Sequence, residues 1–235
     1  MSIAAPAPRV AVQLADLGPV AQLRAGRLPR RLVQLYVGLW LYGVSLALMV
    51  LGDIGLAPWD VLHSGFVRHV PITLGQAVVL FSFVVLVLWI PLREKPGLGT
   101  ISNALVVGVA ADVTLAMFDA PADWPARIAL TIGGIVLCGL ATALYIGAQL
   151  GRGPRDGLMT GLARRTGLSI RLVRTGIEVA VVAVGLVLGG TLGLGTVAYA
   201  LTIGPIAQWL MPRFVVDLPA ARVGGIPDPD PDLLA

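Results

Sequence analysis

One polar segment of the chain reads Gly151-Arg152-Gly153-Pro154-Arg155-Asp156-Gly157-Leu158 and interrupts a sequence that is otherwise almost continuously apolar. Ninety-six positions earlier, the chain reads Gly55-Leu56-Ala57-Pro58-Trp59-Asp60-Val61-Leu62, with the same spacing of glycine, proline, aspartate and leucine. At this offset, residues 31–112 align with residues 127–208 without a gap and are identical at about a quarter of the positions. The chain therefore contains a duplicated unit, and each copy carries one Pro-x-Asp motif.

The composition indicates the class of protein. Of the 235 residues, 57% are hydrophobic and only 13% are charged, and the mean hydropathy is +0.87. A soluble domain carries about 25% charged residues, and a run of about 20 apolar residues is long enough to cross a bilayer. We therefore predict an all-α polytopic membrane protein.

The apolar runs predict six transmembrane helices, three in each copy. The predicted spans are residues 32–51, 74–92, 99–118, 128–150, 172–188 and 195–211. After each Pro-x-Asp break comes a short helical piece, at residues 61–70 and 157–170, which is too short to cross the membrane. Each unit is thus predicted to hold three spans and one half-helix.

The chain divides into five parts on this basis. A cytoplasmic arm at residues 1–31 is either a surface helix or disordered, and it lacks the apolar core of a signal peptide. Repeat 1 covers residues 32–118, an external joint covers 119–127, and repeat 2 covers 128–212. Residues 213–235 are rich in proline and aspartate and are predicted to be a disordered cytoplasmic tail.

Three spans per copy imply that the two copies enter the membrane from opposite sides, as inverted repeats. The distribution of basic residues supports a matching orientation. With both termini inside, 15 of the 17 Lys and Arg residues fall on the inner side, and only Arg68 and Arg127 do not. This positive-inside bias predicts that both the N-terminus and the C-terminus are cytoplasmic.

Several motifs of the second copy resemble one bacterial family. They are Gly151-x-Gly153-Pro154-Arg155-Asp156-Gly157-Leu158-Met159, Arg174-Thr175-x-x-Glu178, Gly189-Gly190-x-x-Gly193-x-Gly195-Thr196 and Ile203-Gly204-Pro205. Together they are similar to the YczE/YyaS-type bacterial integral membrane proteins, which are related to the YitT group. The resemblance covers residues 31–212 and implies a location in the bacterial cytoplasmic (inner) membrane. It suggests transport and supplies no substrate.

The two motifs admit two interpretations. Proline is favoured at the first position of a helix, and a carboxylate in the first turn meets the positive end of the helix dipole. Pro58 and Asp60, like Pro154 and Asp156, could thus only start two short helices. Alternatively, the two half-helices bring their first turns to one binding site, with Trp59 and Arg155 beside the aspartates. Because Asp60 follows Trp59 and not an arginine, it is the preferred proton-binding candidate.

The fifth predicted span contains a charged pair. Arg174 and Glu178 share one helix face at i, i+4 spacing, so they form either a static ion pair or a pathway with a protonatable carboxylate. Asn103 and Tyr199 could line a cavity, whereas Asp112 is predicted to lie at the outer membrane interface. Asn103 and Tyr199 complete the set of substrate-binding or ion-binding candidates.

Other classes of chemistry find no support in the sequence. Cys138 is the single cysteine, and His63 and His69 lack the spacing of metal ligands, so no metal and no cofactor are expected. No nucleophile with a base, no pair of catalytic carboxylates and no phosphate loop is present, so an enzyme is not expected. The basic residues lie at membrane edges, which argues against nucleic acid.

Two functions remain open. The first is a secondary transporter or exporter of an unidentified small molecule, with optional proton coupling through Asp60, Asp156 or Glu178. The alternative is a non-transporting membrane scaffold or accessory protein for another membrane complex. The expected partners are the lipid bilayer and a small-molecule substrate. A homodimer would compensate for the small number of spans.

Overall fold

A computed structural model describes residues 17–218 of the chain, and within this range it contains nine helices and no strands. The helices are α1 (Pro19–Arg24), α2 (Leu28–Gly52), α3 (Pro58–Phe66), α4 (Leu74–Leu92), α5 (Leu98–Met117), α6 (Trp124–Gly147), α7 (Pro154–Thr166), α8 (Ile170–Val187) and α9 (Leu194–Phe214). The predicted order of elements is therefore present, with one helix for every predicted span and one for each short piece.

Five of the six predicted spans are long and apolar enough to cross a bilayer, namely α2, α4, α5, α6 and α9. Helix α8 is not among them. It has 18 residues and includes Arg171, Arg174 and Glu178, and charged side chains oppose insertion into the hydrocarbon core. By length and composition, the structure thus supports five crossings.

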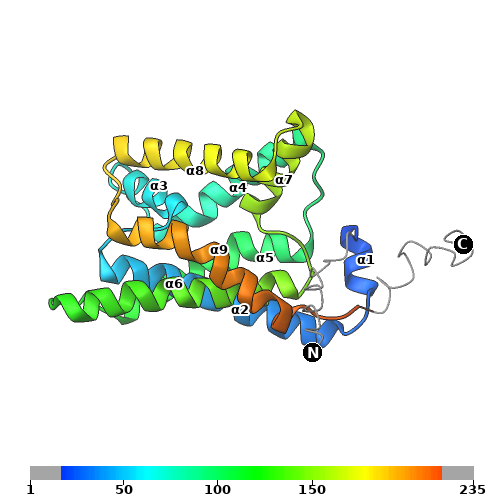
Figure 1. Cartoon of the computed structure of the whole chain (residues 1–235), viewed down its shortest axis with the longest axis horizontal. Helices are drawn as coiled ribbons and strands as arrows, with labels where there is room; N and C mark the ends of the chain where they lie inside the picture. The colour runs from blue at the N-terminus through cyan, green and yellow to red at the C-terminus, as the bar shows by residue number, and fades with distance from the viewer. Residues whose placement is uncertain (1–16, 219–235) are drawn as a thin grey trace, which may run out of the picture.

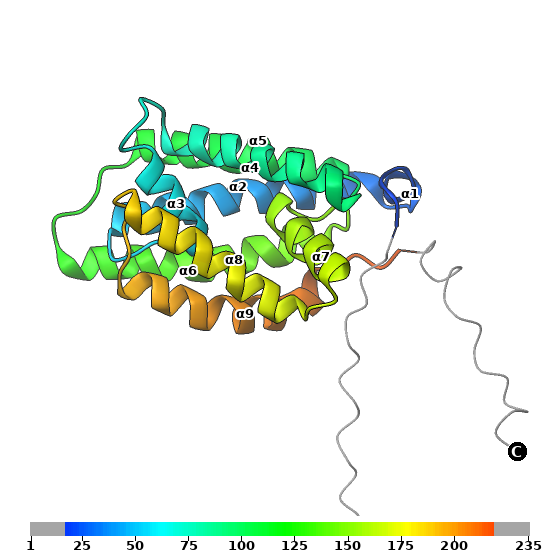
Figure 2. The same ribbon diagram turned by 90° about the horizontal axis from the view of Figure 1, so that it is seen from above.

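The long helices run along the longest axis of the molecule, and α3 and α7 lie toward opposite ends of it in both views (Figures 1 and 2). Helix α2 packs against α6 and α5, and α6 also packs against α9. Helix α3 packs mainly on α8, from the other copy, and α7 mainly on α4. Each short helix is therefore held by a long helix of the opposite copy.

Two arginines at equivalent positions fix the central pair of helices. Arg31, near the start of α2, donates from Nε to the carbonyl of Ala148 at the end of α6, at 2.7 Å. Arg127, near the start of α6, donates from Nε to the carbonyl of Gly52 at the end of α2, at 3.0 Å. The last carbonyls of a helix have no hydrogen-bond donor within the helix. Each arginine therefore supplies a donor to a carbonyl at the end of the opposite helix. These contacts also require α2 and α6 to run antiparallel.

A second reciprocal contact joins the two motif loops to the two Gly-x-Gly-Thr segments. The backbone N–H of Gly99 donates to the carbonyl of Leu150 at 2.7 Å, and the N–H of Gly195 donates to the carbonyl of Ile54 at 3.0 Å. The two hydrogen bonds are equivalent, because Gly195 lies 96 positions after Gly99 and Leu150 lies 96 positions after Ile54. The loop that precedes each short helix is therefore attached to the opposite copy.

Glycine is required in both loops. Gly55 has a φ of 131° and Gly151 a φ of 129°, a region that other residues rarely adopt. A Cβ atom at Gly55 would also lie 2.8 Å from the backbone nitrogen of Gly193, and one at Gly151 would lie 2.9 Å from Oγ1 of Thr100. The equivalent glycines thus allow the same sharp turn and the same close approach.

The short helices begin where the sequence predicts. Pro58 and Pro154 occupy the first turns of α3 and α7, after residues in extended conformation, and each helix carries an aspartate in its first turn. Proline suits this position because its missing N–H would have no partner there. With 9 and 13 residues, neither helix spans a hydrocarbon core about 30 Å thick at 1.5 Å per residue.

Both ends of the described chain depart from the predicted boundaries. The predicted arm contributes α1 and the first residues of α2, and its last residue, Arg31, is fully buried. At the other end, Val216 and Leu218 are buried beside Ala25, although the sequence assigns them to a disordered tail. Gln149 donates to the carbonyl of Val216 at 2.6 Å, which attaches this segment to the end of α6. The predictions for residues 1–16 and 219–235 lie outside the described residues.

The surface of the bundle is apolar. Ile90, Val187, Leu194 and Leu201 each have at least 70% of their surface exposed. Within the bundle, by contrast, polar side chains such as Arg31, Asp60, His63 and Thr100 are buried. Exposed apolar patches of this kind mark a surface that contacts other apolar material, and here the helix lengths match a bilayer.

Candidate functional site

A cavity of about 720 Å³ lies where the first turns of α3 and α7 meet. Its lining comes from six helices, α2, α3, α6, α7, α8 and α9. The polar and aromatic lining residues are Tyr42, Trp59, Thr142, Tyr145, Arg155, Asp156, Arg174, Glu178, Tyr199 and Gln208. Ligand pockets for small molecules typically have volumes of about 300–1,000 Å³, so the cavity has the size of a small-molecule site.

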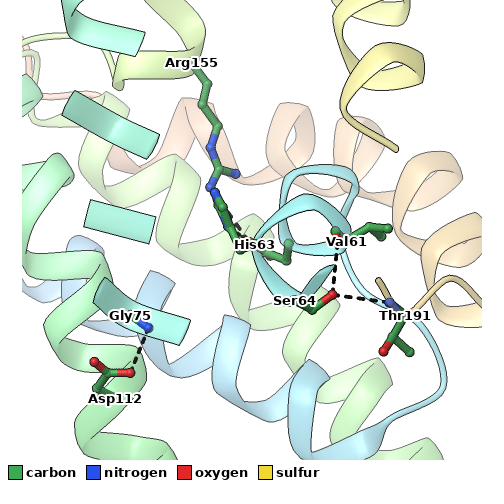
Figure 3. A network of polar contacts seen from close by, with 8 residues as sticks. Val61, His63, Ser64, Gly75, Asp112, Arg155 and Thr191 are labelled. Atoms are coloured by element: carbon green, nitrogen blue, oxygen red, sulfur yellow. Dashed lines mark hydrogen bonds and ion pairs between the residues drawn. The ribbon is translucent and has the colours of Figure 1, made fainter. Parts of the chain in front are cut away.

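Arg155 connects the two motifs. Its Nη2 lies 3.8 Å from Oδ1 of Asp60, and its guanidinium lies over the ring of Trp59 at 5.1 Å from the centroid. Figure 3 shows the arginine reaching from α7 toward the turn of α3 that carries His63. An ion pair and a cation–π contact therefore hold the first turn of one half-helix to the first turn of the other.

The position of Arg155 corrects the predicted environment of Asp60. The sequence places no cation beside Asp60, but Arg155 of the second motif lies next to it, and Nδ1 of His63 lies 3.1 Å from the same carboxylate oxygen. Asp60 is almost fully buried. Sequence reasoning left His63 out of the site. The i, i+3 spacing of Asp60 and His63 on one short helix is the signal that could have included it.

Asp156 has a different environment. Its Oδ2 accepts a hydrogen bond of 2.6 Å from the hydroxyl of Tyr145, and its side chain lines the cavity. Within residues 17–218, no basic side chain forms an ion pair with it, because Arg155 is directed to Asp60 instead. The sequence did not identify Tyr145, which lies within an apolar span and has no spacing relation to Asp156.

Arg174 and Glu178 form the predicted pair on α8. Nε of Arg174 donates to Oε1 of Glu178 at 2.8 Å, and both side chains line the cavity. The arginine side chain is 48% exposed and the glutamate 25%. The pair therefore lies at an open side of the cavity. Contact between the two residues is confirmed, but a role for Glu178 in a pathway stays a prediction.

The remaining candidates lie around the same centre. Tyr199 lines the large cavity and lies 3.6 Å from Sγ of Cys138. Asn103 does not reach it and lines a separate cavity of about 40 Å³ on the other side of Asp156. Both prolines are buried at their helix starts, and the carbonyl of Pro154 accepts a 2.9 Å hydrogen bond from the indole of Trp89.

The small and the large cavity occupy equivalent places in the two copies. The large cavity is lined by Arg174, Glu178, Tyr199 and Ile203, and the small one by the residues 96 positions earlier, Val78, Ser82, Asn103 and Val107. The first set lies between α8 and α9, and the second between α4 and α5. Equivalent positions in the two copies therefore differ: the one in the second copy is open, and the one in the first copy is nearly closed.

Close packing of α4 on α5 closes the small cavity. A Cβ atom at Gly75 would overlap the carbonyl of Gly108. Asp112 holds the contact by accepting from the N–H of Gly75 at 2.7 Å (Figure 3). It also accepts from the hydroxyl of Thr73 at 2.5 Å. This α4–α5 contact joins the last turns of α5 to the start of α4. It lies at the end of α5 for which the sequence predicts an interfacial Asp112.

The second copy does not form the equivalent contact in this structure. Gly75 corresponds to Arg171 and Asp112 to Gln208, while Gly108 keeps its glycine at Gly204. A side chain as large as arginine at the first of these positions prevents the close approach that Gly75 allows. Accordingly, α8 and α9 do not pack closely, and the large cavity extends along α9 to Pro212.

No group of three or more His, Cys, Asp or Glu side chains in the described part of the chain could hold a metal ion. The arrangement can instead bind a small molecule. It offers paired charges, a carboxylate with one hydroxyl donor, aromatic rings and an apolar floor within one cavity.

The apolar outer surface and the membrane-length helices define a polytopic helical membrane protein. Residues 29–212 match the family of unknown function DUF6198, and the chain belongs to this family. It is 38% identical over 177 residues to an uncharacterized protein of Haemophilus influenzae, a match that covers 75% of this chain and 81% of that one.

Two proteins of Bacillus subtilis are also similar. The uncharacterized membrane protein YczE is 29% identical over 182 residues, covering 77% of this chain and 85% of YczE. The uncharacterized protein YyaS is 26% identical over 183 residues, covering 75% and 90% of the two chains. No solved structure matches the chain. The resemblance to the YczE/YyaS-type proteins is thus confirmed, and the protein is an integral membrane protein.

Proposed function

We propose that the protein is a secondary transporter of the bacterial cytoplasmic membrane, and not an enzyme, which moves a small molecule between two inverted repeats. One observation carries this proposal. A cavity of about 720 Å³ lies between α8 and α9, while the equivalent place between α4 and α5 holds only about 40 Å³. A transporter that exposes one site alternately to two sides has this asymmetry in each of its end states.

The reciprocal contacts support the inverted relation of the repeats. Arg31 binds the end of α6 as Arg127 binds the end of α2. Contacts in which i meets j and j meets i are typical of a two-fold axis. Since α2 and α6 run antiparallel, that axis is perpendicular to them and lies in the membrane plane if they cross the membrane.

A sixth crossing by α8 completes the arrangement. Its counterpart in the first copy, α4, is long and apolar enough to span. The charged residues of α8 lie in its first half, and Arg174 is paired with Glu178, which lowers the cost of inserting both. Six crossings place both termini on one side, and the positive-inside rule makes this side the cytoplasm.

In this orientation the observed state is open to the inside. The lining of the large cavity includes Gln208, Met211 and Pro212, which belong to the last turns of α9. Asp112 and Gly75 hold the outer side closed. The outward-open state would separate α4 from α5 and bring α8 closer to α9. Because Arg171 replaces Gly75, α8 and α9 would then remain farther apart than α4 and α5 are here.

Ala111 and Ala207 offer a matched test of this exchange. They are equivalent residues 96 positions apart, but Ala207 lines the large cavity whereas Ala111 is fully buried in α5. We would introduce each as a single cysteine in a Cys138→Ala background and label intact vesicles of known orientation with an impermeant maleimide.

A transporter predicts that Ala207→Cys reacts from the inside and that Ala111→Cys reacts, more slowly, from the outside. Freezing the exchange at low temperature should abolish the outside reaction and spare the inside one. If Ala111→Cys never reacts from the outside, the protein keeps one conformation, which would favour the alternative of a membrane scaffold.

A further inference from the structure

The charges in the large cavity are not equally matched. Arg155 lies against Asp60, and Arg174 lies against Glu178. Asp156 is the remaining charged residue of the lining, and among residues 17–218 its one hydrogen-bond donor is the neutral hydroxyl of Tyr145. Asp156 is partly exposed to the cavity, and a ligand that fills the cavity would remove water from its carboxylate, which makes a positive partner favourable. The site therefore has room for one additional positive charge.

Aromatic rings surround the same place. Tyr42, Tyr145 and Tyr199 lie on three different helices, and all three line the cavity together with Trp59. The faces of such rings attract ammonium groups and other cations, and the attraction grows when the cation loses its water. The rest of the lining includes Ile146, Met159, Ile203, Ala207 and Met211. This part suits apolar substituents.

We infer that the cavity binds a monovalent organic cation with apolar substituents, and that Asp156 is its counter-ion. This inference rests on the cavity of the proposed transporter and names its class of ligand. An anionic ligand would require a free arginine, but both arginines of the lining already have carboxylate partners. The volume of about 720 Å³ accommodates a ligand of drug size.

Tetraphenylphosphonium is a suitable probe, since tetraphenylborate has the same shape and the opposite charge. Both would be titrated into the full-length protein in detergent and followed by calorimetry. The wild type should bind the cation at least tenfold more tightly than the anion. Asp156→Asn should lose at least tenfold in affinity for the cation, whereas Asp156→Glu should keep most of it.

Asp53→Asn is the matched control, because it removes the same charge at an exposed helix end that is bound to Arg127. Its main-chain φ of 49° is one that asparagine adopts readily, so its fold and its affinity for the cation should stay unchanged. Circular dichroism and size-exclusion chromatography would verify that each variant is folded.

Three results would overturn the inference: equal affinity of Asp156→Asn and wild type, preference for tetraphenylborate, and binding of neither probe. The outcome is separable from that of the labelling experiment. Cation binding through Asp156 without exchange of Ala111 would refute transport and keep the site. Exchange without cation binding would refute the ligand class alone.

Discussion

Arg31 and Arg127 make the same contact at opposite ends of the molecule, each from the start of one central helix to the end of the other. The two sites differ in burial. Arg31 is fully buried and also donates to the carbonyl of Gln22 in α1, at 2.5 Å. The side chain of Arg127 is 21% exposed and pairs with the exposed Asp53. Equivalent contacts should therefore contribute unequally to stability.

Replacing each arginine by alanine tests this difference. A hydrogen bond to a charged group contributes about 1.5–3 kcal/mol, and a buried carbonyl without a partner adds a penalty. We expect Arg31→Ala to lower the free energy of unfolding by about 3 kcal/mol or more, and Arg127→Ala by about 1–2 kcal/mol because water reaches its site. Thermal unfolding in detergent measures both, and equal losses would contradict the unequal burial.

Neutralisation of the two motif aspartates should destabilise the protein to different extents. Asp60→Asn removes a nearly fully buried carboxylate that contacts both Arg155 and His63, and it leaves Arg155 without its ion-pair partner, which costs about 2 kcal/mol or more. Asp156→Asn should cost less than about 1 kcal/mol, since the amide oxygen still accepts from Tyr145. The readout is again the unfolding temperature. Greater loss in Asp156→Asn would show that the site roles assigned to the aspartates are reversed.

Arg174 and Glu178 should couple only weakly. Their side chains are 48% and 25% exposed, and an i, i+4 pair at that exposure contributes up to about 1 kcal/mol. In a double-mutant cycle of Arg174→Gln and Glu178→Gln, the losses of stability should be additive to within that amount. A coupling energy of several kcal/mol would mean that the pair is desolvated and that α8 lies deeper in the membrane.

Local features of the fold could be predicted from the sequence. The duplication, the span positions and the helix starts at Pro58 and Pro154 depend on periodicity and on the covalent geometry of proline, which are properties of short segments. The prediction was incomplete for α8, which has the length of a span but carries three charged residues.

Contacts between the copies could not be predicted in this way. The sequence neighbour of Arg155 is Asp156, yet its guanidinium lies beside Asp60, which is 95 residues away. Arg31 was assigned to the arm because it is charged, but it is buried and donates to the carbonyl of Ala148 at the C-terminal end of α6. The asymmetry of the cavities did leave a signal, the change from Gly75 to Arg171 at equivalent positions, but its meaning depends on which helices pack together.

The α4–α5 contact should act as the outer gate of the proposed transporter. Asp112→Ala removes the hydrogen bonds to Gly75 and Thr73 and leaves the glycine contact with Gly108 in place. The closed outer side then loses stability relative to the open one by about 1–3 kcal/mol, the contribution of such bonds to a charged group. We expect labelling of Ala111→Cys from the outside to become at least fivefold faster.

Gln208→Ala is the matched variant on the inner side, because Gln208 occupies the position of Asp112 in the second copy and α8 and α9 are already apart there. It should leave the labelling rate of Ala111→Cys from the outside unchanged. Faster outside labelling in both variants would indicate general loosening of the bundle. If Asp112→Ala does not accelerate the labelling of Ala111→Cys from the outside, releasing Asp112 does not open the outer side. The contact of Asp112 with α4 would then only cap that helix.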